Sequence, residues 1–457
     1  MGTAFPETLF LGETYIVYGL GNSGTHTVKA LLSMGATVFA WDDSENFKPK
    51  EWEEALSGSE FSQLFLSPIT AFPSNAKALI LSPGVPHTYP SPHPIALLAN
   101  KNNIPIISDV ELFYQAVRKS GSKAHFIGIT GTNGKSTCTA LTAHLLSQEN
   151  KEVIAGGNIG KSVFALPLFG DTGIYVIEMS SYMLERLQSF QPDVAAWTTF
   201  SPDHLDRHYD LQGYLKAKRN IFNNLTPSGL AVFGEKEAWS LDEVSLLQDR
   251  SIRCEFAQAF PASKMPLAPH LPGQHNYHNL ALCLFIAKFF GISDEAIANG
   301  VQSFRNLPHR LQMIGHVGKI SFVNDSKATN FEAALPALTA WDDIFWIMGG
   351  IAKANGIEGI EKVASHIQHA FVIGKDAARL SKTLAKAKIP YSLCNSLEDA
   401  TKAAYAQAKE AGKGVVLLSP ACASQDQFRN FEERGHAFAA CCANIASKSE
   451  STQKDNV

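Results

Sequence analysis

Short β-rich runs alternate with helical stretches along the whole chain, and this alternation is the strongest constraint on the fold. A strand followed by a helix and then by another strand predicts parallel sheets covered by helices on both faces. The strands expected from the pattern are 14–18, 37–41, 78–81, 125–129, 174–177, 194–199, 320–323, 344–348, 370–373 and 415–418. The sequence therefore predicts an α/β protein.

The length of 457 residues favours about three domains of roughly 150 residues each. A polar stretch at 118–123 and the run Asn306-Leu307-Pro308-His309 are the expected boundaries. Segment 448–457 is polar, has no apolar period and is expected to be disordered. The domains expected are 1–118, 119–306 and 307–447.

The composition excludes several classes of function. A net charge of -4 argues against non-specific binding to nucleic acid, which needs a basic face. The seven cysteines are odd in number, scattered and outside any CxxC pair, so a reducing compartment is expected. The first residues show no signal peptide, and no apolar run approaches the ~20 residues of a membrane span. These features predict a cytoplasmic protein without membrane insertion.

A glycine-rich loop between a strand and a helix predicts a phosphate site. Its glycines let backbone N–H groups approach phosphate oxygens, the lysine neutralises the terminal phosphates, and the first serine offers a hydroxyl to magnesium. The general pattern has a glycine where Ile129 stands, so the loop is a variant; the alternative is a plain glycine turn with a surface lysine. The loop consists of Gly131, Thr132, Asn133, Gly134, Lys135, Ser136 and Thr137.

Two polar residues follow neighbouring apolar strands. Glu178 ends the strand 174–177, and ligands collect at the carboxyl edge of an open α/β sheet, so it is a candidate Mg²⁺ ligand. The alternative is an acid that stabilises the dipole of the next helix. His204 follows the strand 194–199 among Asp203, Asp206 and Arg207, which favours a polar site over a structural histidine.

An N-terminal glycine motif leaves a second class of function open. Gly19, Gly21 and Gly24 follow the first strand, and Asp42 lies eighteen residues after Gly24, as in a dinucleotide-binding dehydrogenase. The same pattern serves any α/β domain that receives a diphosphate at a helix N-terminus. A dehydrogenase leaves the second glycine loop unexplained.

Seven motifs, in order along the chain, resemble those of the Mur ligase family. They are GITGTNGKST at 128–137, GGNIG at 156–160, EMSS at 178–181, DHLDR at 203–207, GQHN at 273–276, LPHR at 307–310 and NDSKATN at 324–330. The runs SPACASQDQF at 419–428 and FEERG at 431–435 are similar to the D-glutamate-adding branch of the family, and the DNPR-type motif of the diamino-acid-adding branch is absent.

The resemblance implies a Rossmann-like N-terminal domain that binds a UDP-linked substrate. It further implies a central P-loop ATPase-like domain and a C-terminal Rossmann-like domain that binds an amino acid. The activity implied is ATP-dependent ligation through an acyl phosphate, with two Mg²⁺ ions, in bacterial peptidoglycan precursor synthesis. The substrates implied are UDP-N-acetylmuramoyl-L-alanine and D-glutamate; the alternative is another amino-acid-adding Mur-type ligase. The chain is expected to be a monomer.

Site residues follow from the same resemblance. Lys135 would hold ATP phosphates, Ser136 and Glu178 one Mg²⁺, and His204 would help to position a second. Lys218 matches a lysine that the family carbamylates, although composition alone favours a solvated helix lysine. The other residues implied are Asn276, Asn279, Arg310 and Asp325 at the nucleotide; Lys327, Thr329, Lys353, Ser424 and Phe431 at the D-glutamate pocket; and Asn22, Ser23, Asp42, Ser82, Gly84, Asn158, Ser180 and His204 at the UDP-linked substrate. Those expected to act in catalysis are Lys135, Glu178, His204, Lys218, Lys327 and Lys353.

The sequence departs from the family pattern at three places. Ile351 stands where some D-glutamate ligases have an acid after paired glycines, and Pro202 where several relatives have an acid. Asp43-Ser44 occupy a stretch that can carry an arginine. Contacts to the incoming amine and to uridine are therefore expected to differ in detail.

Overall fold

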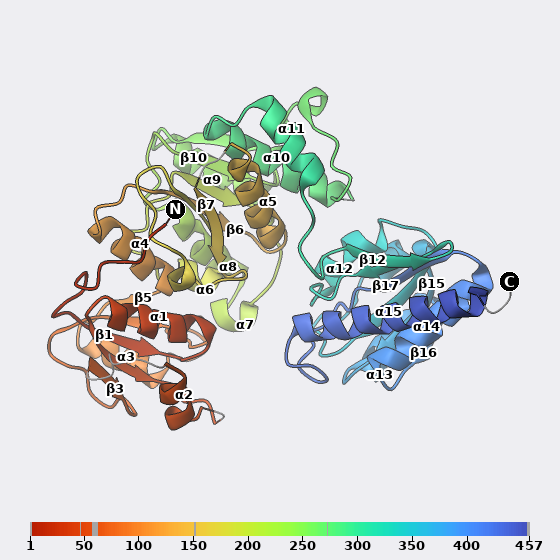
Figure 1. Ribbon diagram of the computed structural model, residues 1–457, viewed down its shortest axis with the longest axis horizontal. Coiled ribbons are helices and arrows are strands. Elements are labelled where there is room, and N and C mark those ends of the chain that lie inside the picture. The colour runs from red at the N-terminus through yellow and green to blue at the C-terminus, as the bar shows by residue number, and fades with distance from the viewer. Residues whose placement is uncertain (1, 46, 57–62, 150–151, 272, 455–457) are drawn as a thin grey trace. The chain divides into compact units, whose positions relative to one another are not determined.

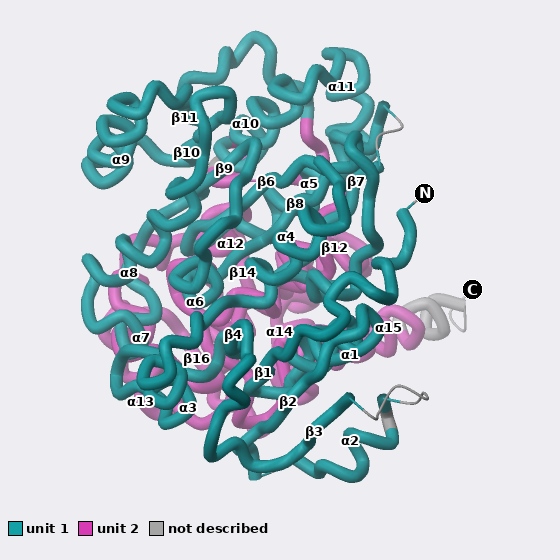
Figure 2. The backbone as a smooth tube through the Cα atoms, turned by 90° about the vertical axis from the view of Figure 1, so that its left-hand side faces the viewer, with its two compact units in different colours: residues 1–267, 278–303 teal, residues 268–277, 304–457 magenta. Residues whose placement is uncertain are grey.

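The computed structural model describes residues 2–45, 47–56, 63–149, 152–271 and 273–454 (Figure 1). The chain forms two compact units, coloured separately in Figure 2. The first unit contains residues 1–267 and 278–303, and the second contains 268–277 and 304–457. The predicted domains 1–118 and 119–306 thus lie almost entirely in one unit, and the division between them near residue 118 stays a prediction.

The first sheet has five parallel strands in the order β3-β2-β1-β4-β5. Every residue of β1 is buried, and its side chains alternate between two cores: Tyr15 and Val17 pack in one, Ile16 and Tyr18 in the other. This pattern is typical of a parallel strand covered on both faces. The strands are β1 (Thr14–Tyr18), β2 (Thr37–Trp41), β3 (Leu64–Leu66), β4 (Ala76–Leu81) and β5 (Ile106–Ile107); the helices are α1 (Asn22–Ser33), α2 (Pro49–Leu56), α3 (Pro94–Lys101) and α4 (Asp109–Lys119).

The second sheet, also in the first unit, has six parallel strands in the order β11-β10-β9-β6-β8-β7. Its central strands β6, β8 and β9 are almost wholly buried. The strands are β6 (His125–Thr130), β7 (Val153–Gly157), β8 (Ile174–Glu178), β9 (Val194–Trp197), β10 (Leu230–Phe233) and β11 (Arg253–Phe256). The helices are α5 (Lys135–Ser147), α6 (Ser181–Leu184), α7 (Leu205–His208), α8 (Leu211–Arg219), α9 (Ala238–Gln248), α10 (Gln274–Phe289) and α11 (Asp294–Ser303).

Helix α4 explains why the first two sheets share one unit. Phe113 and Val117 pack in the core of the second sheet, whereas Leu112 and Ala116 pack in the core of the first. The buried carboxylate of Glu111 also accepts hydrogen bonds from the backbone N–H groups of residues 188–190. The helix that was expected to end one domain therefore fastens both sheets together.

The third sheet, in the second unit, has six strands in the order β12-β13-β17-β14-β15-β16. Only β12 is antiparallel to its neighbour in the described residues, and it forms a hairpin with β13 through Gly318. The strands are β12 (Gln312–Val317), β13 (Ile320–Asn324), β14 (Ile344–Gly349), β15 (Ile367–Ile373), β16 (Tyr391–Leu393) and β17 (Gly414–Leu418); the helices are α12 (Phe331–Leu338), α13 (Ala377–Lys386), α14 (Leu397–Ala411) and α15 (Phe431–Lys454).

The α/β prediction is confirmed, with local corrections. Helix α15 continues to Lys454, so residues 448–454 are helical where the sequence predicts disorder; residues 455–457 lie outside the described part. Extending an existing helix needs no new nucleus, so a polar segment can remain helical without an apolar face. The antiparallel pairing of β12 was not expected. Seven strands of the described residues were not among those expected: β3, β5, β7, β10, β11, β12 and β16.

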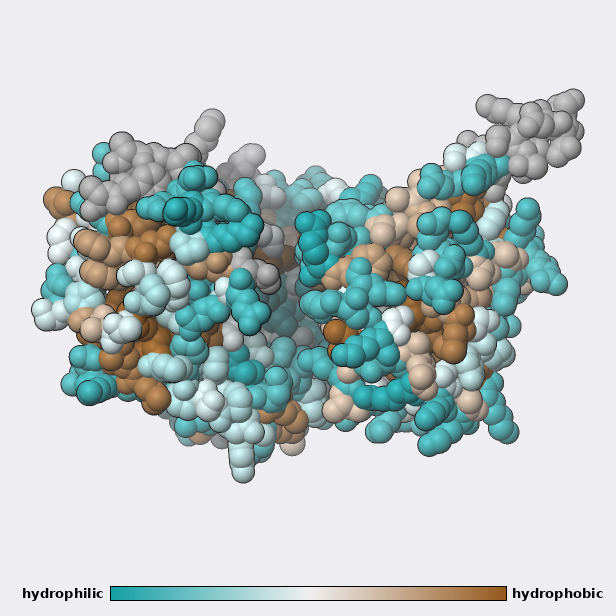
Figure 3. Space-filling view, turned by 90° about the horizontal axis from the view of Figure 1, so that it is seen from below, coloured by the Kyte–Doolittle hydropathy of each residue, from teal (hydrophilic) through white to brown (hydrophobic). Residues whose placement is uncertain are grey.

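The surface mixes polar and apolar residues. On the face in Figure 3, hydrophilic side chains are interspersed with hydrophobic ones, as is normal because folding cannot bury all apolar atoms. Among the described residues, no helix combines the length and the apolar character needed to cross a membrane.

Candidate functional site

The loop after β6 has the backbone of a phosphate-binding turn. Gly131 has φ +146°, and a Cβ there would lie 1.9 Å from Thr198 Oγ1. Gly134 has φ +86° at the N-cap of α5, and a Cβ there would lie 2.6 Å from Asn279 Oδ1. Both positions require glycine, and α5 begins at Lys135, so the positive end of its dipole lies at the loop. The loop also brings Asn279, a predicted nucleotide contact, next to Gly134.

Two lysine side chains converge on one carbonyl of this loop. Lys135 Nζ donates to Gly131 O and to Thr132 O, each at 2.8 Å. Lys218 Nζ, from the end of α8, donates to Gly131 O at 2.7 Å and to Thr130 Oγ1 at 3.3 Å. The side chains of two distant segments are thus held at the same point of the phosphate loop.

Lys218 is a buried lysine, not a solvated one. Its residue is 1% exposed, and this burial, together with the charge of Lys135, lowers the pKa of its amine well below the usual range. Asp203 and Glu178 act in the opposite direction on this pKa. The interpretation of Lys218 as a solvated helix residue, which composition favoured, is wrong.

Glu178 lies one strand away at the same edge of the sheet. The register pairs Glu178 with Ile129, two residues before Gly131, so the prediction that strand and loop meet at this edge is confirmed. Glu178 is 2% exposed; its Oε1 accepts from Asn158 Nδ2 at 2.9 Å. Its Oε2 is buried and has no hydrogen-bond partner among the described residues.

This donor set fits Mg²⁺. A buried carboxylate oxygen without a partner is costly unless a cation or water satisfies it. The described residues contain no group of three or more His, Cys, Asp and Glu side chains arranged so that it could hold a metal ion. Mg²⁺ needs no such cluster, because it is usually bound through one or two carboxylates, phosphate oxygens and water. Glu178, with the hydroxyl of Ser136 in the first turn of α5, has the right chemistry.

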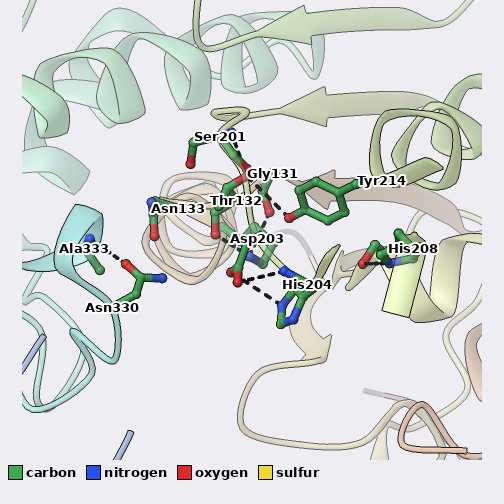
Figure 4. Close-up of polar contacts among 12 residues, drawn as sticks. Gly131, Thr132, Asn133, Ser201, Asp203, His204, His208, Tyr214, Asn330 and Ala333 are labelled. Carbon is green, nitrogen blue, oxygen red and sulfur yellow. Dashed lines mark hydrogen bonds and ion pairs between the residues drawn. The ribbon is translucent and has the colours of Figure 1, made fainter. Parts of the chain in front are cut away.

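The loop after β9 brings the histidine segment to the phosphate loop. Thr132 Oγ1 donates to Ser201 O at 3.2 Å, and Asn133 N donates to Thr199 Oγ1 at 2.8 Å. Figure 4 shows Asp203 and His204 alongside this loop, with His204 Nε2 3.5 Å from Asp203 Oδ2. The His204 side chain is 37% exposed, so its ring is reachable by a ligand.

Five of the residues predicted for the UDP-linked substrate lie in the first sheet, at the ends of β1, β2 and β4. Asn22 and Ser23 begin α1, while Ser82 and Gly84 follow β4. Asp42 Oδ2 accepts from Leu20 N at 2.6 Å and its Oδ1 accepts from Ser44 N at 2.7 Å. Ser180 is also predicted to contact this substrate, but it lies beside the second sheet, where its Oγ caps α6 by accepting from the N–H of Met183.

In the second unit, Asp325 lies at the centre of a polar network. Its Oδ2 accepts from Ser419 Oγ at 2.7 Å and its Oδ1 accepts from Leu311 N at 3.1 Å. Burial raises the pKa of Asp325 to about 7, although the nearby guanidinium groups of Arg310 and Arg434 lower it.

Arg434 ties together the loops predicted to hold the amino acid. It donates to Ser326 Oγ at 3.0 Å, Ser326 O at 2.8 Å and Cys422 O at 3.0 Å. Lys327, next in the chain, has its Nζ 3.8 Å from the ring centroid of Phe431. Phe431 O accepts a hydrogen bond from Ser326 Oγ at 2.8 Å, which joins this predicted pocket residue to the same network.

The paired-glycine loop of the second unit is held by another acid. The N–H of Ile351 donates to Ala423 O at 2.9 Å. Asp376 Oδ2 accepts from Ala352 N at 2.8 Å, so a carboxylate from the next loop contacts this turn. Ser424 is buried beside Ala423, and Lys353 follows Ala352. Thr329 is half-buried after Ala328.

The structure thus brings the predicted residues together in groups. In the first unit these are the phosphate loop with Glu178, Asn158, His204, Lys218 and Asn279, and the substrate residues at the edge of the first sheet. Asn276, Arg310, Asp325, Lys327, Thr329, Lys353, Ser424 and Phe431 belong to the second unit. Sequence reasoning missed Thr199, Arg186 and Glu111, which make hydrogen bonds to residues 66 or more positions away along the chain.

Family sequence models match two parts of this chain. The Mur ligase middle domain matches residues 129–256, and the Mur ligase, glutamate ligase domain matches residues 309–422. The UDP-N-acetylmuramoylalanine--D-glutamate ligase of Paramagnetospirillum magneticum is 40% identical over 451 residues, covering 94% of this chain and 96% of that protein. The protein of the same name from Caulobacter sp. strain K31 is 38% identical over 462 residues, covering 95% and 97%.

Solved structures share the fold. UDP-N-acetylmuramate-alanine ligase from Thermotoga maritima matches with a TM-score of 0.57 and 16% identity, covering 95% of this chain and 99% of that chain. MurF ligase from the same organism, in complex with ADP, matches with a TM-score of 0.56 and 15% identity, covering 95% and 96%. At these identities the likeness concerns the fold alone.

Proposed function

The chain belongs to the Mur ligase family, and we propose that it joins D-glutamate to UDP-N-acetylmuramoyl-L-alanine with the conversion of ATP to ADP and phosphate. It is an acid–amino-acid ligase of peptidoglycan precursor synthesis. The observation that carries the proposal is the site at the edge of the second sheet. There Lys135, Glu178 and Lys218 lie at a glycine-rich loop that leads into the N-terminus of α5.

The first step proposed is transfer of the ATP γ-phosphate to the substrate carboxylate. A carboxylate is a poor electrophile, and phosphorylation gives it a good leaving group. Crowded anions must be neutralised for this step, which is the role of Lys135 and of the backbone N–H groups of Gly131–Thr137. Asn276 and Asn279 would hold the adenine side of the nucleotide.

The metal site proposed uses Ser136, Glu178, His204 and Lys218. Bound Mg²⁺ would supply Lewis-acid charge neutralisation at the phosphates. The partnerless Oε2 of Glu178 supports this role. For Lys218, an ammonium would repel the metal, whereas a carbamate presents oxygens; the depressed pKa favours the neutral amine that reacts with carbon dioxide.

The second unit would supply the amino acid. D-Glutamate carries two carboxylates, and Lys327 and Lys353 are suitable cationic partners. Thr329, Ser424 and the backbone of Phe431 would complete the pocket. Arg310 and Asp325 are proposed nucleotide contacts. A monomer in the bacterial cytoplasm is the state and location that we propose.

An ATP-dependent phosphate-release assay tests the assignment. The full chain with Mg²⁺ is offered UDP-N-acetylmuramate with L-alanine, UDP-N-acetylmuramoyl-L-alanine with D-glutamate, or the D-glutamyl product with diamino acids. Release that requires D-glutamate is expected. Release with L-alanine and none with D-glutamate would overturn the assignment in favour of another amino-acid-adding Mur-type ligase. Addition of NAD and candidate alcohols should leave the nicotinamide absorbance band unchanged.

A further inference from the structure

Two arginines of the second sheet's helical layer hold the loop that follows β4. Residues 81–85, here called the 81–85 loop, contain the predicted substrate residues Ser82 and Gly84. Arg186 donates to Leu81 O at 2.6 Å, Ser82 O at 3.0 Å and Val85 O at 2.6 Å. Arg207 donates to Gly84 O at 3.1 Å and lies 3.5 Å from Pro83 O. All five carbonyls of the loop therefore face a guanidinium group.

Arg186 is built into this position. It is 2% exposed, and its Nε also donates to His87 Nδ1 at 3.3 Å. Burial lowers the pKa of its guanidinium to about 10, with the carboxylates of Glu185 and Asp109 acting in the opposite direction, so the side chain stays charged at neutral pH. A planar fork that reaches several carbonyls at once is a geometry that lysine cannot reproduce.

The opposite side of the 81–85 loop contacts the glycine motif of the first sheet. Ser82 N donates to Tyr18 O at 2.9 Å, and a Cβ at Gly19 would lie 2.4 Å from Ser82 Cβ. A displacement of the 81–85 loop would therefore also alter the turn that begins α1. Arg186 comes eight residues after Glu178 along the chain, just past α6, so one short segment joins the phosphate-site edge to the substrate loop.

We propose that Arg186 is a positioning residue for the UDP-linked substrate, with Arg207 as its weaker companion. It fixes the 81–85 loop against the glycine motif, so that the diphosphate end of the substrate meets a preformed surface. This inference rests on the proposed function, because that function supplies the UDP-linked substrate. Arg186 is not expected to touch the reacting carboxylate or the phosphates of ATP.

A purely architectural role would look different. Loss of uniform substrate binding raises KM while kcat is unchanged, whereas general destabilisation lowers the fraction of active protein and affects all substrates alike. Arg250 provides a matched control, since it donates to Phe222 O, Asn223 O and Leu225 O at 2.8–2.9 Å, far along the chain from the 81–85 loop. Arg186→Lys and Arg250→Lys each weaken one arginine clamp on three carbonyls.

The test measures steady-state kinetics and binding of UDP by titration calorimetry. For Arg186→Lys we expect KM for the UDP-linked substrate and Kd for UDP to rise about tenfold, equivalent to about 1.4 kcal/mol. The kcat value and the KM values for ATP and D-glutamate should change less than about threefold. Arg207→Lys should shift the same two constants in the same direction but less, and it serves if Arg186→Lys fails to fold. Arg250→Lys should leave both constants unchanged.

The outcomes separate the two levels of inference. If the wild-type protein, Arg186→Lys and Arg207→Lys all bind UDP with the same Kd, the positioning role alone is overturned. Equal rises in all three KM values, or the same shift in Arg250→Lys, would also overturn it. Wild-type protein that binds UDP but releases no phosphate with D-glutamate would overturn the proposed function, and one that binds no UDP would overturn both.

Discussion

Glu111 on α4 is the residue whose replacement should most directly loosen the joint between the first two sheets. Its carboxylate is fully buried and accepts five hydrogen bonds. Oε2 accepts from Gln188 N and Phe190 N, both at 3.0 Å. Oε1 accepts from Ser189 N at 2.8 Å, Ser189 Oγ at 2.5 Å and Gln115 Nε2 at 2.7 Å.

Glu111→Gln keeps the shape but turns one oxygen into a donor. If the NH₂ group replaces Oε2, the N–H groups of Gln188 and Phe190 lose their acceptor. If it replaces Oε1, Ser189 N and the Gln115 amide lose theirs. Two donors lose their acceptor either way. Because Gln188 and Ser189 are exposed residues and Gln115 is half-buried, each loss should lie at the low end of the range, about 1 kcal/mol, so the free energy of unfolding should fall by about 2 kcal/mol. That corresponds to a fall in Tm of at least about 4 °C for the first unit.

Thermal unfolding and hydrogen exchange at the amides of 188–190 measure this effect. Exchange of these amides should become faster in Glu111→Gln. The control is Glu243→Gln. Within the described part of the chain, its buried carboxylate accepts only from the Arg219 guanidinium, so exchange at 188–190 should stay unchanged. A Tm within about 1 °C of wild type, together with unchanged exchange, would refute the inference that the Glu111 hydrogen bonds stabilise the joint.

Two lysine variants probe the phosphate site. Because the folded-state pKa of Lys218 is depressed, burial of its ammonium destabilises the protein below the unfolded pKa, most strongly at low pH. Lys218→Met should therefore raise Tm at pH 7 in buffer free of carbon dioxide. The increase in Tm should shrink as pH rises toward 10.5, the ordinary pKa of lysine. Gly131 O keeps a donor in this variant, because it still accepts from Lys135. The same variant should lose most activity, and Lys218→Ala should be partly rescued by small carboxylates; an active Lys218→Met would discredit the carbamate. Lys135→Ala should abolish phosphate release with an unchanged Tm, and full activity would remove its role at the phosphates.

Local pattern predicted the elements that carry the site. The apolar strands 125–129 and 174–177 were identified because both faces of a parallel strand are buried, and parallel pairing then places the following Gly131 and Glu178 at one edge. The burial of Lys218 was not predictable from composition, because an isolated helix gives no sign of what packs over its last turn.

The features that sequence could not provide depend on distant contacts. Arg186 reaches carbonyls more than 100 residues away, and Glu111 receives amides nearly 80 residues away. The sharing of α4 between two cores likewise arises from tertiary packing, which the local polarity at 118–123 does not reveal. The antiparallel pairing of β12 with β13 was not expected, because alternating strands and helices predict parallel neighbours.

The hydrogen bonds that Lys135 makes to Gly131 O and Thr132 O have a thermodynamic consequence. A polyphosphate that binds more than one of the three ammonium hydrogens must displace at least one of these carbonyls, so the carbonyls compete with it for the ammonium group. The lysine therefore contributes less to nucleotide affinity than its charge suggests, because only the difference between the two sets of bonds is gained. Inorganic anions, with fewer other contacts to the loop, gain least from the exchange, so the arrangement favours ligands that engage the whole turn.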